Sequence, residues 1–197
     1  MSKVVTSSAF LDAVRSRRSF YQLNNRSPID SNRLAEIIKT TVLHCPSSFN
    51  SQSTRLLVLL NEEHKKLWDI TKHELEPLVH GEQRETTMKK LDGLRAGYGT
   101  ILFYEDPKPT AELQSKFPLY ATKFPQWAEH SNAMHQYIRF GCNLQHYNPV
   151  IDLKVGTKWK VNPNWSLKGQ LVFGSPIGDP KEKSYQPWES RVDIRGL

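Results

Sequence analysis

The chain has 197 residues, of which 38% are hydrophobic and 24% charged. This composition is that of an ordinary globular domain large enough to bury a core, and it excludes a disordered or membrane-spanning chain. The formal net charge of +7 at pH 7 suits nucleic acid, a membrane surface or a phosphorylated cofactor, and it equally suits a mildly basic solvated surface.

The first residues lack the uninterrupted apolar core of a signal peptide, so we expect a cytoplasmic protein that is also compatible with the nucleus. Apolar residues then recur at helical spacing, and short apolar runs between polar flanks indicate buried strands. The pattern predicts helices over residues 7–17, from 31 to a stop at Pro46, from about 62, partly over 81–95, and over 128–137. It predicts strands over residues 56–60, 100–104 and 167–173.

No repeat, low-complexity stretch or shift of composition marks a domain boundary, so residues 1–197 are expected to form one domain. Residues 107–125 mix prolines with aromatic side chains and give no clear element. Strands that alternate with helices indicate a layered fold of α and β elements. The tail, residues 177–197, is polar and has no core of its own, so it needs another surface, which a partner subunit would supply.

Two polar segments in the first quarter of the chain are candidate binding sites. Arg17, Arg18 and Ser19 can grip a phosphate or a flavin edge, or the arginines can simply complement a helix C-terminus. The run Pro46–Gln52 contains Ser47, Ser48, Asn50 and Gln52. These side chains can offer neutral donors and acceptors to a heteroaromatic ring, or they can form the capped first turn of a helix.

Two further candidates lie near the end of the chain. The segment Gly141–Asn148 places a glycine before amide, imidazole and phenol groups, and His146 is either a proton donor or an ordinary surface or core histidine. The turn-like segment Gly174–Lys183 delivers Lys181 and Lys183, which can bind phosphate as point charges or belong to a solvated loop.

Several sharper motifs are missing from the sequence. No G-x-G-x-x-G follows a predicted strand, and neither a P-loop nor a G-x-S-x-G motif occurs. The two cysteines, Cys45 and Cys142, have no metal-ligand spacing, and His130 and His135 lie on different faces of a helix. We therefore expect no metal and reduced thiols without a disulfide. Basic and aromatic residues form no RNA-binding pattern, so no nucleic-acid partner is expected. No apolar run is long enough to span a membrane, so no membrane is expected either.

These segments resemble the nitroreductase superfamily, and most of all its fungal fatty-acid-repression-mutant-like branch (type III). The resemblance covers nearly the whole chain and rests on pieces in the family's order: AVRSRRSFYQL, HCPSSFNSQSTRLLVL, GYGTILFYED, WAEHSNAMHQ, LQHYNP and LKGQLVFGSP. The resemblance implies an α+β fold with a small, mainly antiparallel sheet surrounded by helices. It also implies an intertwined homodimer in which the tail 177–197 wraps the partner subunit.

The resemblance further implies two FMN sites at the dimer interface. Arg17, Arg18 and Ser19 would contact FMN from one subunit, whereas the polar side chains of segment 46–52 would approach it from the other. Lys183 and Lys181 would hold the ribityl phosphate. The implied activity is ping-pong: NADH or NADPH reduces the flavin by hydride transfer and leaves, and a nitroaromatic or quinone-like acceptor then takes the electrons. The family also implies a link to oxidative stress and lipid signalling.

The chain departs from the family pattern at two places. Tyr21 stands where many relatives carry a basic residue, which removes a charge near the flavin. Before Gly141, the run from Ala133 passes almost directly into the glycine segment, and about seven residues, close to two helical turns, are missing. The alternative function is therefore a catalytically impaired flavin-binding or interaction protein in redox or lipid signalling.

Overall fold

The computed structural model describes residues 7–27, 29–136, 142–187, 191–192 and 195. Within these ranges the helices are α1 (Ser7–Ser16), α2 (Ser31–His44), α3 (Asn61–Leu75), α4 (Gly81–Arg95), α5 (Pro107–Lys116), α6 (Phe124–His135) and α7 (Asp152–Lys158). The strands are β1 (Leu23–Asn24), β2 (Thr54–Leu60), β3 (Gly99–Glu105), β4 (Cys142–Gln145), β5 (Ser166–Phe173) and β6 (Ser175–Pro176). Short 3-10 turns occupy Ser48–Asn50, Glu76–Leu78 and Pro118–Tyr120.

A four-stranded sheet forms the centre of the molecule, in the order β2-β3-β5-β4. Each neighbouring pair is antiparallel. Every residue of β3 is buried, because helices cover both faces of the sheet at this strand. A sheet of this kind surrounded by helices is the α+β class that the resemblance implies, and that prediction is confirmed.

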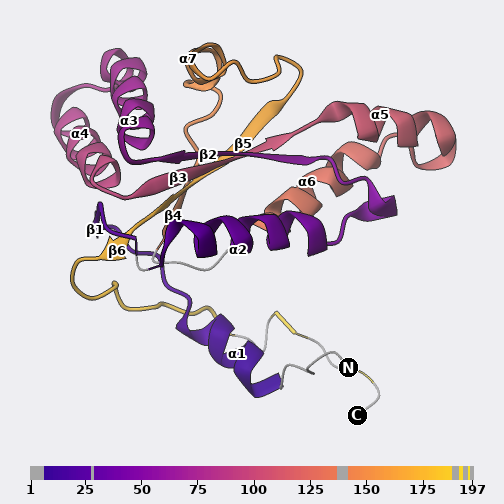
Figure 1. The fold of residues 1–197 in the computed structure, drawn as a ribbon, viewed down its shortest axis with the longest axis horizontal. Coiled ribbons are helices and arrows are strands. Elements are labelled where there is room, and N and C mark those ends of the chain that lie inside the picture. Colours follow the sequence, from indigo (N-terminus) through magenta and orange to yellow (C-terminus); the bar gives the residue numbers. More distant parts are fainter. Residues whose placement is uncertain (1–6, 28, 137–141, 188–190, 193–194, 196–197) are drawn as a thin grey trace.

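The two faces of the sheet bury two separate apolar cores (Figure 1). On one face, α3, α4 and α7 pack against alternate residues of β3, such as Leu102, with the fully buried Trp68 near the centre. On the other face, which α2 and α6 cover, Ile101 and Phe103 pack with Leu34 of α2. The period-2 alternation of strand side chains therefore assigns successive β3 residues to different helix layers.

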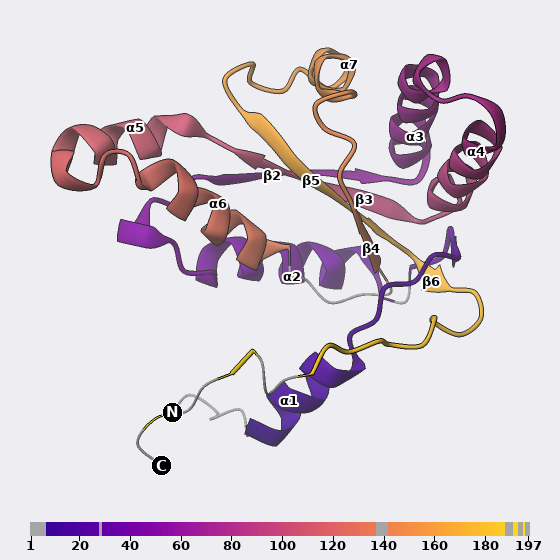
Figure 2. The ribbon, with the colours of Figure 1, turned by 180° about the vertical axis from the view of Figure 1, so that it is seen from behind.

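A two-stranded ribbon and helix α1 lie outside this layered body. β1 pairs with β6, with Leu23 opposite Pro176 and Asn24 opposite Ser175. Figures 1 and 2 show α1 standing apart from the sheet, with the chain after β6 running beside it. The ribbon therefore connects the start of the chain to the segment that follows the last sheet strand.

The predicted elements agree with the structure where the apolar pattern is strong. All three predicted strands exist, and the charged stretch Gly81–Arg95 is helical throughout. The sequence pattern makes Leu78 available for packing in the third predicted helix, but its side chain is 60% exposed. The reason is that α3 ends at Leu75, and Pro77, which lacks a backbone N–H, lies in the 3-10 turn that follows.

A buried histidine, His64, couples the core under α3 to pH. Its Nδ1 lies 2.8 Å from Thr100 Oγ1, which also accepts a hydrogen bond from Trp68 Nε1. Burial lowers the pKa of His64 to about 4, although the backbone carbonyls of Arg95 and Leu94 oppose that shift. The imidazole is therefore neutral in the folded protein at neutral pH.

Acidification is expected to destabilise the protein through His64. In the unfolded chain the imidazole takes up a proton near pH 6.5, whereas in the folded chain it does so only near pH 4. Between these values the unfolded state binds more protons than the folded state, so the free energy of unfolding falls as the pH falls. At about pH 5, protonation of His64 in the unfolded chain lowers it by about 2 kcal/mol. Above about pH 6.5 the imidazole is neutral in both states, so the stability that acidification removes is fully present there. Urea titrations of wild type and His64→Asn at several pH values measure the effect, and an equal pH slope in the two proteins would contradict it.

Candidate functional site

The segment that leaves α1 is fixed against the edge strand β4. Ser19 forms a parallel bridge with Cys142, and the Phe20 N–H donates to the Cys142 carbonyl at 3.2 Å. The Asn143 Nδ2 donates to the Phe20 carbonyl at 3.1 Å. Two neighbouring side chains, Arg17 and Ser19, are thereby held at a set position beside the sheet.

A hollow of about 330 Å³ opens beside this segment. Arg17, Ser19 and Gln136 supply its polar walls, and its apolar walls include Leu144 and Leu171. The residues of the lining that the structure describes include no carboxylate, and the Gln136 amide is oriented by a 3.1 Å hydrogen bond to Asn132 Oδ1. A cationic wall and apolar surfaces suit a ring system that carries an anionic group.

The segment after β6 brings two lysines to the same end of the molecule. Gly178 has φ 78, a left-handed conformation that glycine adopts without strain, and the chain turns there. Lys183 Nζ then donates to the Arg15 carbonyl at 2.5 Å, and Lys181 Nζ lies 5.2 Å from the centre of the Tyr21 ring. The structure thus gathers the first and last candidates, while Arg18 is half-buried in the same segment.

The polar loop between α2 and β2 contains the 3-10 turn Ser48–Asn50. Its Ser47 Oγ accepts from the Gln52 N–H at 3.0 Å, and the Ser48 N–H donates to Ser131 Oγ on α6 at 3.4 Å. Asn50 and Gln52 are exposed and have φ values of 54 and 47. Backbone strain of this kind at non-glycine residues is concentrated in functional loops.

Within a single chain, the Arg17–Ser19 segment and the polar loop do not lie together. The Arg17–Ser19 segment lies toward the N-terminal end of α2, whereas the polar loop follows its C-terminal end (Figure 1). Helix α2 has 14 residues, which corresponds to a length of about 21 Å. The predicted site residues therefore form two half-sites, at opposite ends of one helix.

The remaining sequence candidates have other positions. His146 is exposed just after β4, and Gly141 lies outside the described residues. The predicted loss of two helical turns also falls mainly on residues 137–141, outside the described part; α6 itself ends at His135. His135 is buried and His130 exposed, as expected for different helix faces. Among the described residues, no group of histidine, cysteine or acidic side chains is placed to hold a metal ion.

Sequence reasoning missed an aromatic cluster beside the polar loop. The Phe49 ring stacks on Trp127 at 6.0 Å and an interplanar angle of 9°. Phe117, Phe124 and Tyr120 also surround Phe49, which remains 49% exposed. The proline–aromatic pattern of residues 117–127 was the available sequence signal, and these residues form a partly exposed aromatic cluster next to one half-site.

The fold and the two half-sites define the class of protein. The fold is that of the solved nitroreductase CinD from Lactococcus lactis in complex with nicotinic acid, with a TM-score of 0.87 and 38% identity over 95% of this chain and 100% of that one. Further structures of CinD contain chloramphenicol and 4-nitrophenol. This chain belongs to the Nitroreductase family, whose pattern it matches over residues 14–137.

Two proteins of Saccharomyces cerevisiae that carry the nitroreductase name are similar over most of the chain. HBN1 is 34% identical over 195 residues, which cover 94% of this chain and 95% of HBN1. FRM2 is 29% identical over 186 residues, which cover 89% of this chain and 92% of FRM2. Solved nitroreductases that contain FMN, at 16% and 14% identity, share the fold. In the described residues, no helix is both long and apolar enough to cross a bilayer.

Proposed function

We propose that this protein is an FMN-dependent NAD(P)H oxidoreductase that reduces nitroaromatic or quinone-like acceptors by a ping-pong mechanism. The observation that carries the proposal is the pair of half-sites: a cationic hollow at one end of α2 and a strained, neutral polar loop at the other. Reduction of such oxidants would give the protein a role in the oxidative stress response. Cys45 and Cys142 form no disulfide, as is typical of the reducing cytoplasm and nucleus, where we propose the protein works.

A homodimer would complete the site, because a two-fold axis brings the loop of one copy to the hollow of the other. Helix α1 supports a second copy: Phe10, Leu11 and Val14 are 62%, 45% and 37% exposed on its surface. Leu43 at the end of α2 is 76% exposed. Apolar side chains gathered on unpacked helices mark association surfaces. We propose that residues 1–197 act as one domain and that the tail 177–197 wraps the partner.

The side chains present fit an FMN molecule. Arg17, with Lys183 beside the same helix end, would hold the phosphate through charge-assisted hydrogen bonds. Ser19 lines the same hollow, and Arg18 and Lys181 would contact the FMN from the neighbouring chain segments. Ser47, Ser48, Asn50 and Gln52 of the other copy would face the ring. When bound, FMN supplies the electron-transfer chemistry between a nicotinamide donor, NADH or NADPH, and the acceptor.

The residues of the chain then bind and orient rather than act as acids or bases. Amide groups such as those of Asn50 and Gln52 can donate hydrogen bonds to a ring edge on which negative charge develops. Phe49, which remains 49% exposed and stacks on Trp127, offers aromatic surface for an aromatic acceptor.

The purified protein is expected to be yellow, dimeric and to contain about one FMN per chain. With a nitroaromatic acceptor it should oxidise NADH or NADPH, because the flavin links the two half-reactions. Visible absorption, light scattering and donor oxidation measure these properties. A folded protein that stays colourless after reconstitution with FMN would contradict the proposal. Bound FMN without turnover by any donor would instead favour the alternative function, a catalytically impaired flavin-binding protein.

A further inference from the structure

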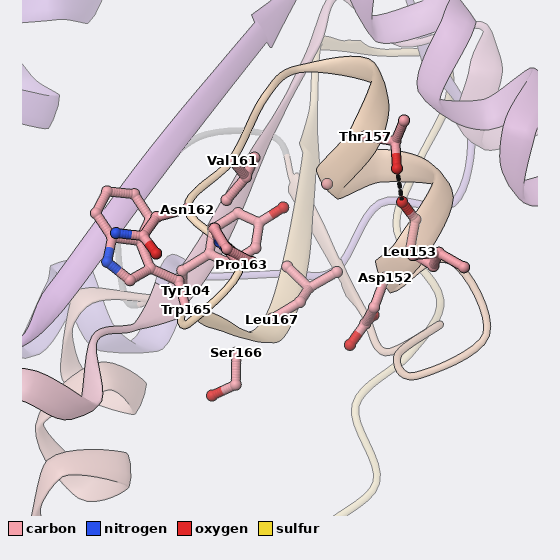
Figure 3. Close-up of a pocket in the computed structure, with 11 residues that line it drawn as sticks. Tyr104, Asp152, Leu153, Thr157, Val161, Asn162, Pro163, Trp165, Ser166 and Leu167 are labelled. Carbon is pink, nitrogen blue, oxygen red and sulfur yellow. Dashed lines mark hydrogen bonds between the residues drawn. The ribbon is translucent and has the colours of Figure 1, made fainter.

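A second cavity lies on the opposite side of the sheet from the cationic hollow. Its volume is about 470 Å³, within the size range of small-molecule sites. It is enclosed by α7, by the loop between α7 and β5, and by the strands β3 and β5. In Figure 3, Tyr104 and Trp165 lie on one side of the cavity, and Asp152 lies with Leu153 and Thr157 on the α7 side.

Polar atoms in the wall of this cavity are buried without a partner. Among the described residues, three buried atoms of this lining make no hydrogen bond: Tyr104 Oη, Asp152 Oδ1 and Trp165 Nε1. Tyr104 is only 4% exposed. Each such atom costs about 1–3 kcal/mol relative to a paired one, and native proteins contain few of them. Tyr104 Oη and Asp152 Oδ1 can each accept a hydrogen bond, so a molecule with donor groups in this cavity would pair with them.

The chemistry of the walls selects the kind of molecule. Leu153, Val161, Pro163 and Leu167 provide apolar surface, and the Trp165 ring lies 6.4 Å from the Tyr104 ring, centre to centre. Asp152 provides a carboxylate, which attracts a cation and repels an anion. Burial raises the pKa of Asp152, so a bound cation would relieve the cost of its charge.

The charged groups nearby leave the carboxylate of Asp152 available. Lys168 opposes the rise of the Asp152 pKa, but its Nζ already donates to Glu129 Oε1 at 2.8 Å. The guanidinium of Arg55 lies 5.7 Å from the centre of the Trp165 ring and is paired with Asp106 at 2.9 Å. Neither cation therefore pairs with Asp152 in the structure.

We propose that this cavity is a second small-molecule site, specific for hydrophobic primary amines. The ammonium group would bind the Asp152 carboxylate and the Tyr104 hydroxyl, and the hydrocarbon body would lie against Leu167 and Trp165. The cavity is separated from the cationic hollow by the sheet, so a molecule in it would not displace a flavin. The inference stands on the cavity itself and is independent of the proposed redox activity.

Calorimetric titration of the purified holoprotein with phenethylamine tests the proposal. We expect saturable binding, and binding at least tenfold weaker to Asp152→Asn, which keeps the shape of the side chain and removes its charge. Tyr104→Phe should weaken binding several-fold while the protein remains folded. Glu112→Gln removes one exposed charge on α5, away from the cavity lining, and should bind as wild type does.

Matched ligands complete the test. 2-Phenylethanol should bind more weakly than the amine, and 3-phenylpropionate should not bind, because its carboxylate would face Asp152. The proposal is overturned if phenethylamine gives no saturable heat, if Asp152→Asn and Tyr104→Phe both bind it as tightly as wild type, or if 3-phenylpropionate binds equally well. If Asp152→Asn does not fold, the Tyr104→Phe titration and the ligand series decide the question.

Discussion

Replacing Gly174 by alanine is expected to lower the free energy of unfolding by about 3 kcal/mol, the upper part of the range for overpacked sites. A Cβ at this position would overlap the carbonyl oxygen of Asn24 and would lie 3.1 Å from the backbone nitrogen of Tyr98. Both obstacles are backbone atoms, so no side chain can rotate away to make room. The β1–β6 ribbon has to separate, or the end of β5 has to move.

The effect should reach the cationic hollow, because the ribbon positions it. Ser175 N–H donates to the Arg26 carbonyl at 2.8 Å, and Ile177 N–H donates to the Gln22 carbonyl at 3.0 Å. The first bond holds the chain after β1 against β6, and the second holds the chain before β1 against the chain after β6, so that Arg17 stays near Lys183. Gly174→Ala is therefore expected to weaken FMN retention as well as stability.

Thermal unfolding followed by circular dichroism measures the first effect, and we expect the midpoint to fall by about 6–12 °C for a chain of this size. Gly93→Ala is the matched control. Gly93 lies in α4, and the nearest atom to an added Cβ there is the Tyr21 carbonyl oxygen at 3.5 Å. Because alanine is favoured over glycine inside a helix by about 0.5–1 kcal/mol, this variant should be as stable as wild type or more so. Equal midpoints for the two variants would refute the argument.

Sequence patterns predicted the long strands of the sheet better than the short elements and the site. Residues 56–60 and 100–104 are short, almost entirely apolar runs, and residues 167–173 end in the apolar Leu-Val-Phe. Burial in the sheet leaves this local signal in the sequence. Strand β4, by contrast, has four residues, of which Asn143 and Gln145 are polar. It exists because it pairs with β5, a contact that no local pattern records. Helix α7 has seven residues and includes Gly156, so it too leaves a weak helical signal.

The site residues were visible in the sequence only as separate polar segments. Nothing local relates Arg17 to Lys183; pairing of β1 with β6 and the turn at Gly178 bring them together. The second cavity left no signal in the sequence, because Tyr104 reads as part of a buried strand and no pattern singles out Asp152. Only the packing of α7 over the sheet places both in one cavity.

Mixing two inactive variants is expected to restore FMN binding if each site is shared between two copies. Arg17→Ala damages the cationic hollow, and Ser48→Trp obstructs the polar loop. In a mixed dimer, one site combines both defects, and the other combines the intact Arg17 of one copy with the intact loop of its partner. Random assortment of equal amounts should restore about one quarter of the wild-type FMN sites, whereas sites built within single chains would restore none.

The reverse mixture provides the matched control. A chain carrying both substitutions, mixed with an equal amount of wild type, spoils both sites of every mixed dimer if the sites are shared, so about one quarter of all sites should bind FMN. Sites within single chains would leave about one half. FMN content after unfolding and refolding each mixture, with light scattering to confirm dimers, distinguishes the two cases. The contrast follows from the position of the two half-sites at opposite ends of α2, since a helix about 21 Å long separates groups that only a second copy can bring together.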